Sequence, residues 1–212
     1  MGRLINGILG AFTGTVATVI GSSRRGIPYM KGRHKARTKN VSESELQNRC
    51  KFAVAQAWLK PLLSVVREGF KNYSAKSQGF VSAKSYLYKH ALKEEGGTVS
   101  IDPSLMRISF GSLPISENAA VSITGSYELT LTWDPDSRES EYNRDQVLMA
   151  AYNIVEGRVS SVLTGQFRSV GKDILPISPE SKPGAVLHVY IAFIAADRSR
   201  QSDSVYLGEV IL

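Results

Sequence analysis

The chain has 212 residues, of which 42% are hydrophobic and 21% are charged. These proportions are typical of folded globular proteins and exclude global disorder. The formal net charge is +7, but residues 1–100 hold 17 Lys and Arg against 5 Asp and Glu, whereas residues 101–212 hold 9 against 14. The sequence therefore predicts a positive end and a mildly negative end.

Residues 1–21 are apolar, but they lack the pattern of an export signal or a membrane span. Arg3 is the only basic residue at the start, threonines interrupt the apolar run, and no clear small-residue cleavage site follows. The run is also short and rich in glycine for a transmembrane helix. We therefore expect a cytoplasmic or virion-associated protein rather than a secreted one, and the sequence disfavours a membrane partner. The sequence does not identify the compartment itself.

A β-hairpin is predicted over residues 14–33, within a basic arm that spans residues 1–40. The β-branched run GTVATVIG favours a strand, SSRRG supplies a polar turn, and IPYMKGR returns as the second strand, with Pro28 favouring an edge position. Seven basic residues within sixteen positions form the candidate binding segment: Arg24, Arg25, Lys31, Arg33, Lys35, Arg37 and Lys39.

Three kinds of anionic partner fit this basic segment. They are nucleic acid, an anionic membrane surface and the negative face of another protein, which includes the acidic half of a neighbouring copy. The alternative is a solvated strand edge, at which Lys and Arg prevent unwanted pairing. We expect a protein partner or self-association, with nucleic acid as the alternative, and no small-molecule substrate.

Residues 41–97 are predicted to be helical. Ser42 and Glu45 match a capping box, so a helix should begin there. An apolar stripe follows at helical spacing: Leu46, Cys50, Ala53, Val54, Ala57, Trp58, Leu62, Val65 and Val66. Pro61 must kink this helix or start a second one. A further helix is predicted over 82–95, and Gly96 and Gly97 would end it.

From Thr98 onward, short apolar or alternating runs alternate with turn-rich stretches. The candidate strands are LMRISFG, YELTLTW, QVLMAAY, VLHVYIAFIA and SVYLGEVIL. Their spacing predicts an antiparallel β-sandwich or barrel over residues 98–212. The positions of Trp133 and Tyr190 on two of these runs resemble fibronectin-type sandwiches, which favours a sandwich of the immunoglobulin or fibronectin type with both side chains largely buried. The predicted fold class is therefore α+β, with an N-terminal hairpin and helices followed by this sandwich.

Several motifs resemble a large family of bacterial proteins catalogued as a domain of unknown function. They are Gly7 to Gly10, Gly21 to Gly26 with its Gly-Ser-Ser, the basic stretch 31–39, the Gln-x-x-x-Lys-Phe pattern of Gln47 to Phe52, Trp133 with an acidic loop, and SDSVYLGEV near the end. The resemblance implies a fold and a bacterial or mobile-element origin, but no activity. A weaker N-terminal similarity to small proteins encoded near phage structural genes suggests an assembly role.

The sequence offers few candidate catalytic or metal-binding residues. His34, His90 and His188 are far apart in sequence, and no motif joins a nucleophile to a base. Cys50 is the only cysteine, which excludes an intrachain disulfide and a multi-cysteine zinc site, and its helical pattern predicts a buried side chain. The weak metal candidate is calcium, at an acidic loop containing Asp134, Asp136 and Glu139.

We therefore predict a non-enzymatic structural, assembly or interaction protein without a cofactor. In this interpretation the basic N-terminal segment docks to a partner, and the β-sandwich is the exposed or repeating module. The alternative is a nucleic-acid-binding protein that uses the same basic segment, including the layout of a coat protein with a basic arm.

Overall fold

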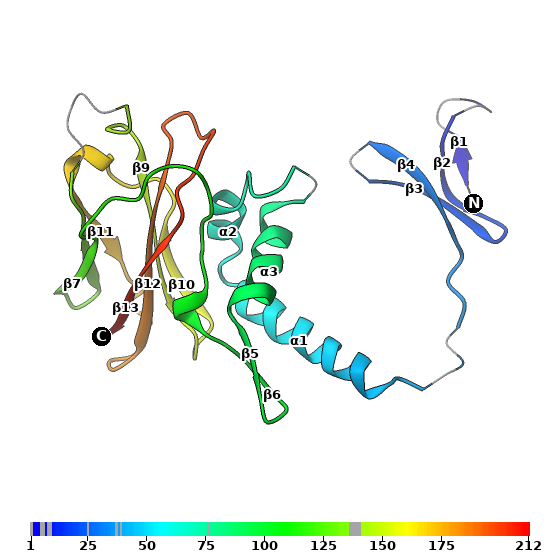
Figure 1. Cartoon of the computed structure of the whole chain (residues 1–212), viewed down its shortest axis with the longest axis horizontal. Helices are drawn as coiled ribbons and strands as arrows, with labels where there is room; N and C mark the ends of the chain where they lie inside the picture. Colours follow the sequence, from blue (N-terminus) through cyan, green and yellow to red (C-terminus); the bar gives the residue numbers. More distant parts are fainter. Residues whose placement is uncertain are drawn as a thin grey trace. The chain divides into compact units, whose positions relative to one another are not determined.

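A computed structural model describes residues 2–4, 7, 10–24, 26–36, 38, 40–75, 77–135 and 141–212 (Figure 1). The described chain contains three α-helices and thirteen β-strands, and all paired strands of its four sheets are antiparallel. This confirms the predicted α+β class, with a mostly β composition. The chain forms two compact units, 1–45 and 46–212.

The N-terminal unit is a four-stranded sheet with the order β1-β2-β3-β4. Its strands are β1 (Arg3–Leu4), β2 (Phe12–Val16), β3 (Val19–Arg24) and β4 (Ile27–Gly32). The predicted hairpin is present as β3 and β4, and Pro28 lies on the edge strand β4, where no neighbour needs its missing N–H. The run GTVATVIG, however, is not one strand. It reverses at Ala17, whose φ is +49°, so β2 and β3 form a further hairpin.

Three helices begin the second unit: α1 (Glu43–Leu59), α2 (Leu63–Gly69) and α3 (Gly79–His90). The predicted cap is present, since the backbone N–H of Glu45 donates to Ser42 Oγ with 3.3 Å between N and O. Pro61 separates α1 from α2, as predicted. No helix in the described part of the chain is long and apolar enough to cross a membrane.

The predicted helix over 82–95 is wrong in its second half. Helix α3 ends at His90, and a hairpin of β5 (Leu92–Glu95) and β6 (Thr98–Ile101) follows. Gly96 and Gly97 join the two strands with φ values of +56° and +83°. Two consecutive residues with positive φ suit the tightest hairpin turn, so these glycines reverse a strand rather than end a helix.

The remaining strands form two sheets. The larger has the order β10-β9-β12-β13, and its strands are β9 (Gln146–Asn153), β10 (Arg158–Val162), β12 (Val186–Ile194) and β13 (Val205–Ile211). The smaller has the order β11-β8-β7, and its strands are β7 (Ala120–Gly125), β8 (Glu128–Thr132) and β11 (Lys172–Pro176). Four of the five predicted runs contain one of these strands.

The fifth run, LMRISFG, is not a strand. After a short 3-10 turn over Pro103–Leu105 the chain is irregular, because its polar groups bond to loops and not to a neighbouring strand. Ser109 Oγ donates to the carbonyl oxygens of Gly69 and Ser202, at 3.2 and 2.7 Å. This segment therefore joins the end of α2 to the loop before β13.

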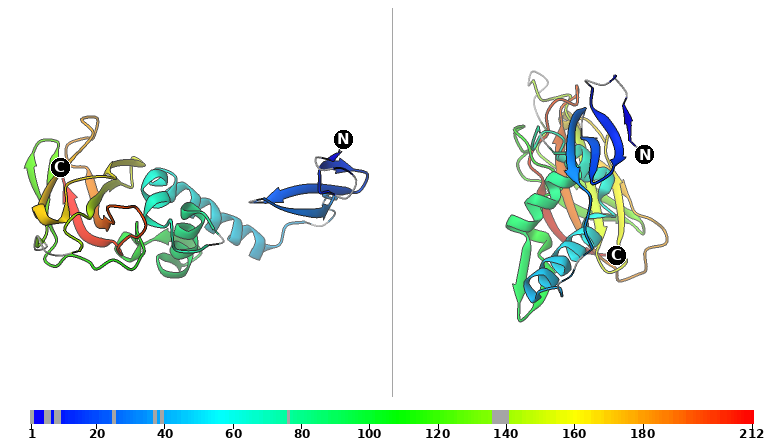
Figure 2. Two further views of the ribbon diagram at one scale, coloured as in Figure 1. Left: turned by 90° about the horizontal axis from the view of Figure 1, so that it is seen from above. Right: turned by 90° about the vertical axis from the view of Figure 1, so that its right-hand side faces the viewer.

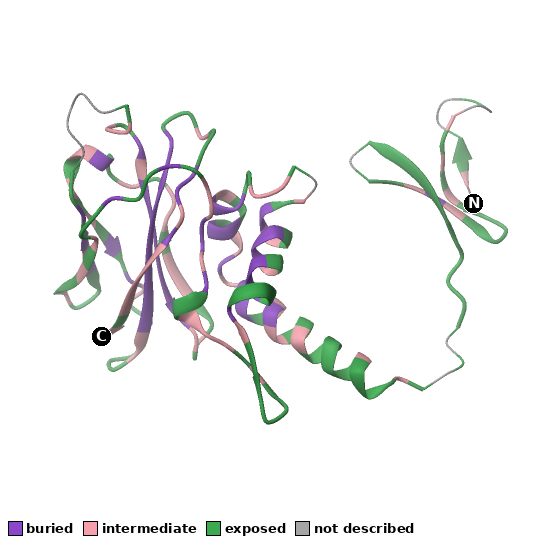
Figure 3. Cartoon of the chain, viewed as in Figure 1, coloured by how far each residue is buried: buried purple, intermediate pink, exposed green. Residues whose placement is uncertain are grey.

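Strands β9 and β12 are buried on both faces, as Figure 3 shows. Alternate residues of each strand belong to two different clusters. Val147 and Met149 pack with Leu129, Leu131 and other residues of the smaller sheet. Leu148, Ala150, Tyr152 and further side chains of the other face pack with the helices. The smaller sheet thus covers one side of the larger sheet, and α1–α3 cover the other (Figure 2).

The helical segment predicted over 41–97 therefore shares a core with the strands predicted over 98–212. Tyr152 of β9 illustrates the contact: its Oη donates to the Trp58 carbonyl at 3.0 Å, and the two rings meet edge to face. The predicted burial of Cys50 is wrong, because the first half of α1 does not reach this core and the thiol is exposed. The predicted burial of Trp133 and Tyr190 is confirmed.

Replacing Trp133 tests the packing of the two sheets. The side chain is 3% exposed, its Nε1 donates to the Arg168 carbonyl at 2.8 Å, and its ring contacts Phe193. We expect Trp133→Ala to destabilise the protein by about 3–5 kcal/mol, because it leaves a cavity and an unpaired carbonyl. Thermal unfolding measures this loss. Val155→Ala, at a position that is 94% exposed, is the control, and equal melting temperatures for both variants would contradict the assignment.

Candidate docking surface on the N-terminal sheet

The N-terminal sheet has two chemically different faces, which its strand register defines. Residues opposed in an antiparallel pair share a face, and neighbours along a strand alternate between faces. One face of β2–β4, which we call the basic face, carries Thr15, Ile20, Ser22, Arg24, Ile27, Tyr29 and Lys31. Of the predicted binding residues, Arg24 and Lys31 therefore lie on the same face, with Tyr29 at a register position between them.

The opposite face, which we call the apolar face, has no charged residue. Across β2–β4 it carries Gly14, Val16, Val19, Gly21, Ser23, Pro28, Met30 and Gly32, and the Phe12 carbonyl and ring lie over Gly21. The distribution of charge along the sequence does not reveal this surface. A two-residue alternation over β4 is the signal that separates Met30 from Tyr29 and Lys31.

This sheet has almost no core of its own. Gly21 is the only buried residue among the described residues of the N-terminal unit. It is a glycine because Phe12 lies on it: a Cβ at Gly21 would collide with the Phe12 carbonyl and ring. Met30 is 72% exposed, and Leu4 and Val16 are each about half exposed. These large apolar side chains therefore contact solvent, and Figure 3 draws nearly all of the described sheet as exposed or intermediate.

Positive charge continues along the chain after the sheet. Arg33 and Lys35 are exposed in the extended residues 33–36, and the Arg33 N–H donates to the Thr18 carbonyl at 2.7 Å. Glu43 is the first acidic residue of the chain, so no acidic residue interrupts the basic segment. The other predicted members, Arg25, Arg37 and Lys39, lie outside the described residues.

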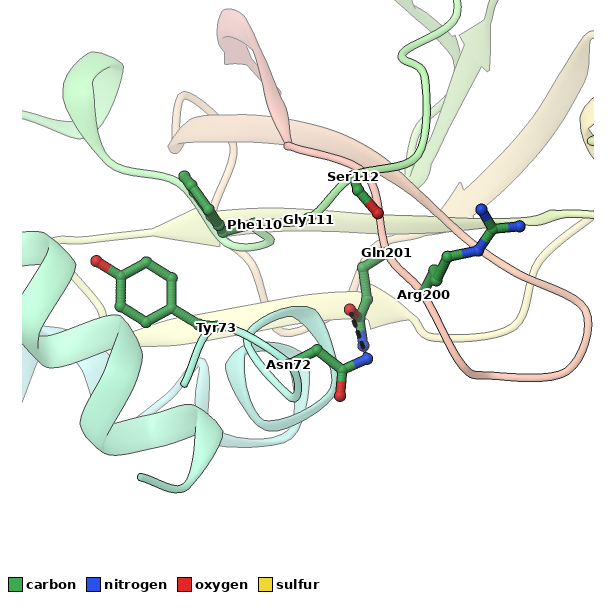
Figure 4. A pocket seen from close by; sticks show the side chains of 7 residues that line it. All are labelled: Asn72, Tyr73, Phe110, Gly111, Ser112, Arg200 and Gln201. Carbon is green, nitrogen blue, oxygen red and sulfur yellow. Dashed lines mark hydrogen bonds between the residues drawn. The ribbon is translucent and has the colours of Figure 1, made fainter. Parts of the chain in front are cut away.

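A second candidate is a pocket of about 300 Å³ in the second unit (Figure 4). Its lining residues are Asn72, Tyr73, Phe110, Gly111, Ser112, Arg200 and Gln201. The rings of Tyr73 and Phe110 meet edge to face with centroids 5.0 Å apart, and Asn72 Nδ2 donates to Gln201 Oε1 at 3.4 Å. None of the lining residues is His, Cys, Asp or Glu, so the Ser112 hydroxyl has no base among them.

The three histidines lie in different local surroundings, and Asp134 is the calcium candidate that the structure describes. His34 is exposed in the N-terminal unit, the His90 ring packs on Tyr86, and His188 is buried in β12. Asp134 Oδ2 accepts a hydrogen bond from Asn118 Nδ2 at 2.7 Å, while Asp136 and Glu139 lie outside the described residues. Among the residues that the structure describes, no group of three or more His, Cys, Asp or Glu is arranged to hold a metal ion.

The groups with the largest pKa shifts have structural roles. Burial raises the pKa of the Tyr152 phenol to about 12, and this phenol bonds to helix α1. Burial also raises the pKa of Tyr190, whose Oη donates to the Pro103 carbonyl at 2.7 Å. Hydrogen bonds from Lys93 and then Ser104 lower the pKa of the Asp102 carboxyl to about 2. Each of these groups also makes a hydrogen bond to another part of the chain.

The fold and this surface define the class of protein: an α+β protein whose mainly β second unit is preceded by a separate, exposed basic sheet. The chain belongs to the family of unknown function DUF6266, whose model matches residues 11–208. This confirms the family resemblance of the sequence motifs. No curated protein and no solved structure matches the chain.

His188 gives a pH test of the buried strand β12. Burial lowers its pKa below 6.5, although the carboxylate of Glu209 acts in the opposite direction, and Nδ1 lies 2.9 Å from Tyr206 Oη. The folded state thus binds this proton less readily than the unfolded state, so stability is lost as pH falls through the unfolded pKa of about 6.5. We expect His188→Gln to show a shallower fall in melting temperature than the wild type between about pH 7 and pH 5. Identical slopes would contradict the burial of His188.

Proposed function

We propose that this chain is a non-enzymatic interaction protein that takes part in an assembly, with the N-terminal unit as its docking element. The observation that carries the proposal is a separate sheet that exposes large apolar side chains on one face and basic side chains on the other. A unit as small as residues 1–45 rarely buries enough surface to be stable alone, and in this proposal a partner supplies the missing contacts. A phage or mobile-element origin is part of this proposal.

We also propose that strands β7–β13 form a sandwich of the immunoglobulin or fibronectin type. In such folds the first, second and fifth strands share one sheet, and the third, sixth and seventh share the other. Counted from β7, the smaller sheet contains the first, second and fifth strands, β7, β8 and β11. The larger sheet contains the third, sixth and seventh, β9, β12 and β13, with β10 as an additional strand. Both sheets therefore agree with this topology. Such sandwiches have many functions, so this topology supports a binding module without identifying its ligand.

Nucleic acid binding is the second candidate function. The presence of Arg24 and Lys31 on one face, with Arg33 and Lys35 following, favours it. One tyrosine on this face offers little base stacking, so contacts would be mainly to phosphates. The apolar face argues for the assembly role, because phosphate binding does not require it.

Deleting residues 2–36 tests the docking role. Every buried apolar side chain among the described residues lies in the second unit, so we expect the remaining chain to keep its melting temperature within about 2 °C. We also expect the deletion to abolish self-association, measured by sedimentation velocity. In cells that naturally express the protein, a tagged chain with this deletion should no longer retain its partners. A deleted chain that associates as the full chain does would contradict the proposal.

Duplex DNA titration separates the two candidate functions. For the assembly role we expect no binding near physiological salt and no excess absorbance at 260 nm. For the alternative, contacts to about four to six phosphates give a slope of log K against log salt of roughly −4 to −5. Replacing Arg24, Lys31, Arg33 and Lys35 with Gln would then remove most of that slope. The nucleic-acid function would be favoured if log K fell steeply with log salt for the wild type and only weakly for this variant.

A further inference from the structure

We infer that the pocket lined by Tyr73, Phe110, Arg200 and Gln201 binds a ligand in which an apolar group carries a carboxylate. A free carboxylic acid and the C-terminal residue of another protein both have this chemistry. The pocket lies wholly within the second unit, so the inference goes beyond the docking role proposed for the N-terminal unit and does not depend on it. Its volume of about 300 Å³ is at the lower end for ligand pockets, so the bound group is small.

Two aromatic rings form the apolar wall of this pocket. Tyr73 follows helix α2, and Phe110 lies in the irregular segment before β7. Both side chains pack on the helix-side core but remain only partly buried. Arg107 Cζ lies 5.7 Å from the centre of the Phe110 ring, and the Phe110 N–H donates to the Gly69 carbonyl at 2.9 Å. The wall is therefore held in place before a ligand arrives, which reduces the entropy cost of binding an apolar group on it.

Gln201 brings a hydrogen-bond donor to the pocket. Asn72 Nδ2 donates to the Ser199 carbonyl and, at 3.4 Å, to Gln201 Oε1. Because a carbonyl oxygen only accepts, these bonds fix the orientation of both amides. Gln201 is 1% exposed, and its Nε2 forms no hydrogen bond with any residue that the structure describes. A buried donor without a partner is costly, so this amide nitrogen calls for an acceptor on a ligand.

The Arg200 guanidinium supplies a positive charge without an internal counter-charge. Within the described part of the chain it forms no hydrogen bond or ion pair. The loop between β12 and β13 holds two carboxylates, and both have other partners. Asp197 Oδ1 accepts from the Ser199 N–H at 2.9 Å, and Asp203 pairs with Arg107. Since a guanidinium can bind a carboxylate through two parallel N–H bonds, Arg200 can receive an anion from outside the chain.

The order of these groups fits a ligand with one apolar end and one anionic end. In Figure 4 the Gln201 amide lies between the Tyr73 ring and the Arg200 guanidinium, which points away from both rings. An apolar group over the rings would direct its carboxylate past Gln201 towards Arg200. Inorganic phosphate fits less well, because it has no apolar part to cover the rings.

Matched probes test the carboxylate and the source of the ligand. N-acetylphenylalanine mimics a C-terminal residue, its amide lacks the charge, and phenylacetate keeps a ring and a carboxylate without the peptide group. In the isotope-labelled full-length chain, the NMR signals of the Gln201 side-chain amide report on the bound ligand. We expect N-acetylphenylalanine to shift these signals with a dissociation constant of about 1 mM or below. Its amide should bind at least about fivefold more weakly, because it forms no charged pair with Arg200.

The comparison of the two acids identifies the source. Tighter binding of N-acetylphenylalanine than of phenylacetate would assign the pocket to the C-terminal residue of a protein. Equal or weaker binding would assign it to a free carboxylic acid. Either result supports a site for an apolar carboxylate.

Two arginines of the same loop give a matched pair of variants. Arg200→Gln removes the guanidinium at the pocket, whereas Arg198→Gln removes one that donates to Gln146 Oε1 and does not line the pocket. We expect Arg200→Gln to weaken binding of N-acetylphenylalanine at least about fivefold and to abolish its preference over the amide. Arg198→Gln should change the dissociation constant less than about twofold. Backbone amide signals away from the loop show that each variant is folded.

Three results would overturn the inference. One is the absence of any shift of the Gln201 side-chain signals at the highest soluble concentration of either acid. Another is equal affinity for N-acetylphenylalanine and its amide. The third is an equal effect of the two arginine variants. Because deletion of residues 2–36 leaves every residue of this pocket in place, a failure here is distinct from a failure of the docking role.

Discussion

Strands β9 and β12 lie at the centre of the larger sheet and are buried on both faces, and the layers of the second unit follow from this constraint. A strand with apolar residues at every position has no face for solvent, so both sides of its sheet must be covered. The smaller sheet covers one side and the helices cover the other. The helices are therefore part of the same core, and a sandwich without them would expose the face of Tyr152 and Tyr190.

Close backbone contacts then connect the layers. The segment before β7 runs between the end of α2 and the loop before β13, where Ser204 Oγ accepts from the Ile108 N–H at 2.9 Å. Gly111 must be a glycine, because a Cβ there would collide with the Gln201 carbonyl. The N-terminal unit has such a close contact at Gly21, which Phe12 covers, but its described residues bury no large side chain. A unit with so little buried apolar surface has little hydrophobic stabilisation of its own.

Local signals in the sequence predicted the elements that depend on local chemistry. The Ser42 cap, the break at Pro61 and the turn before β4 each follow from residues close in sequence. The reversal at Ala17 has no glycine or proline to mark it, and the exposure of Cys50 depends on where helix α1 leaves the core. The basic residues of the candidate site were visible as charge. The apolar face was not, because it appears only when the register of four strands is known.

The two faces of the N-terminal sheet differ in how they respond to solution conditions, and in the proposed assembly they are coupled. Burial of apolar side chains depends little on salt, whereas contacts of Arg24 and Lys31 with an anionic partner weaken as salt screens them. A sheet with almost no core of its own gains order when its apolar face is covered. That ordering holds the basic side chains in one geometry before the anion arrives and so reduces the entropy cost of binding it. By linkage, an anionic partner then favours the assembled form to the same degree that assembly favours the anion.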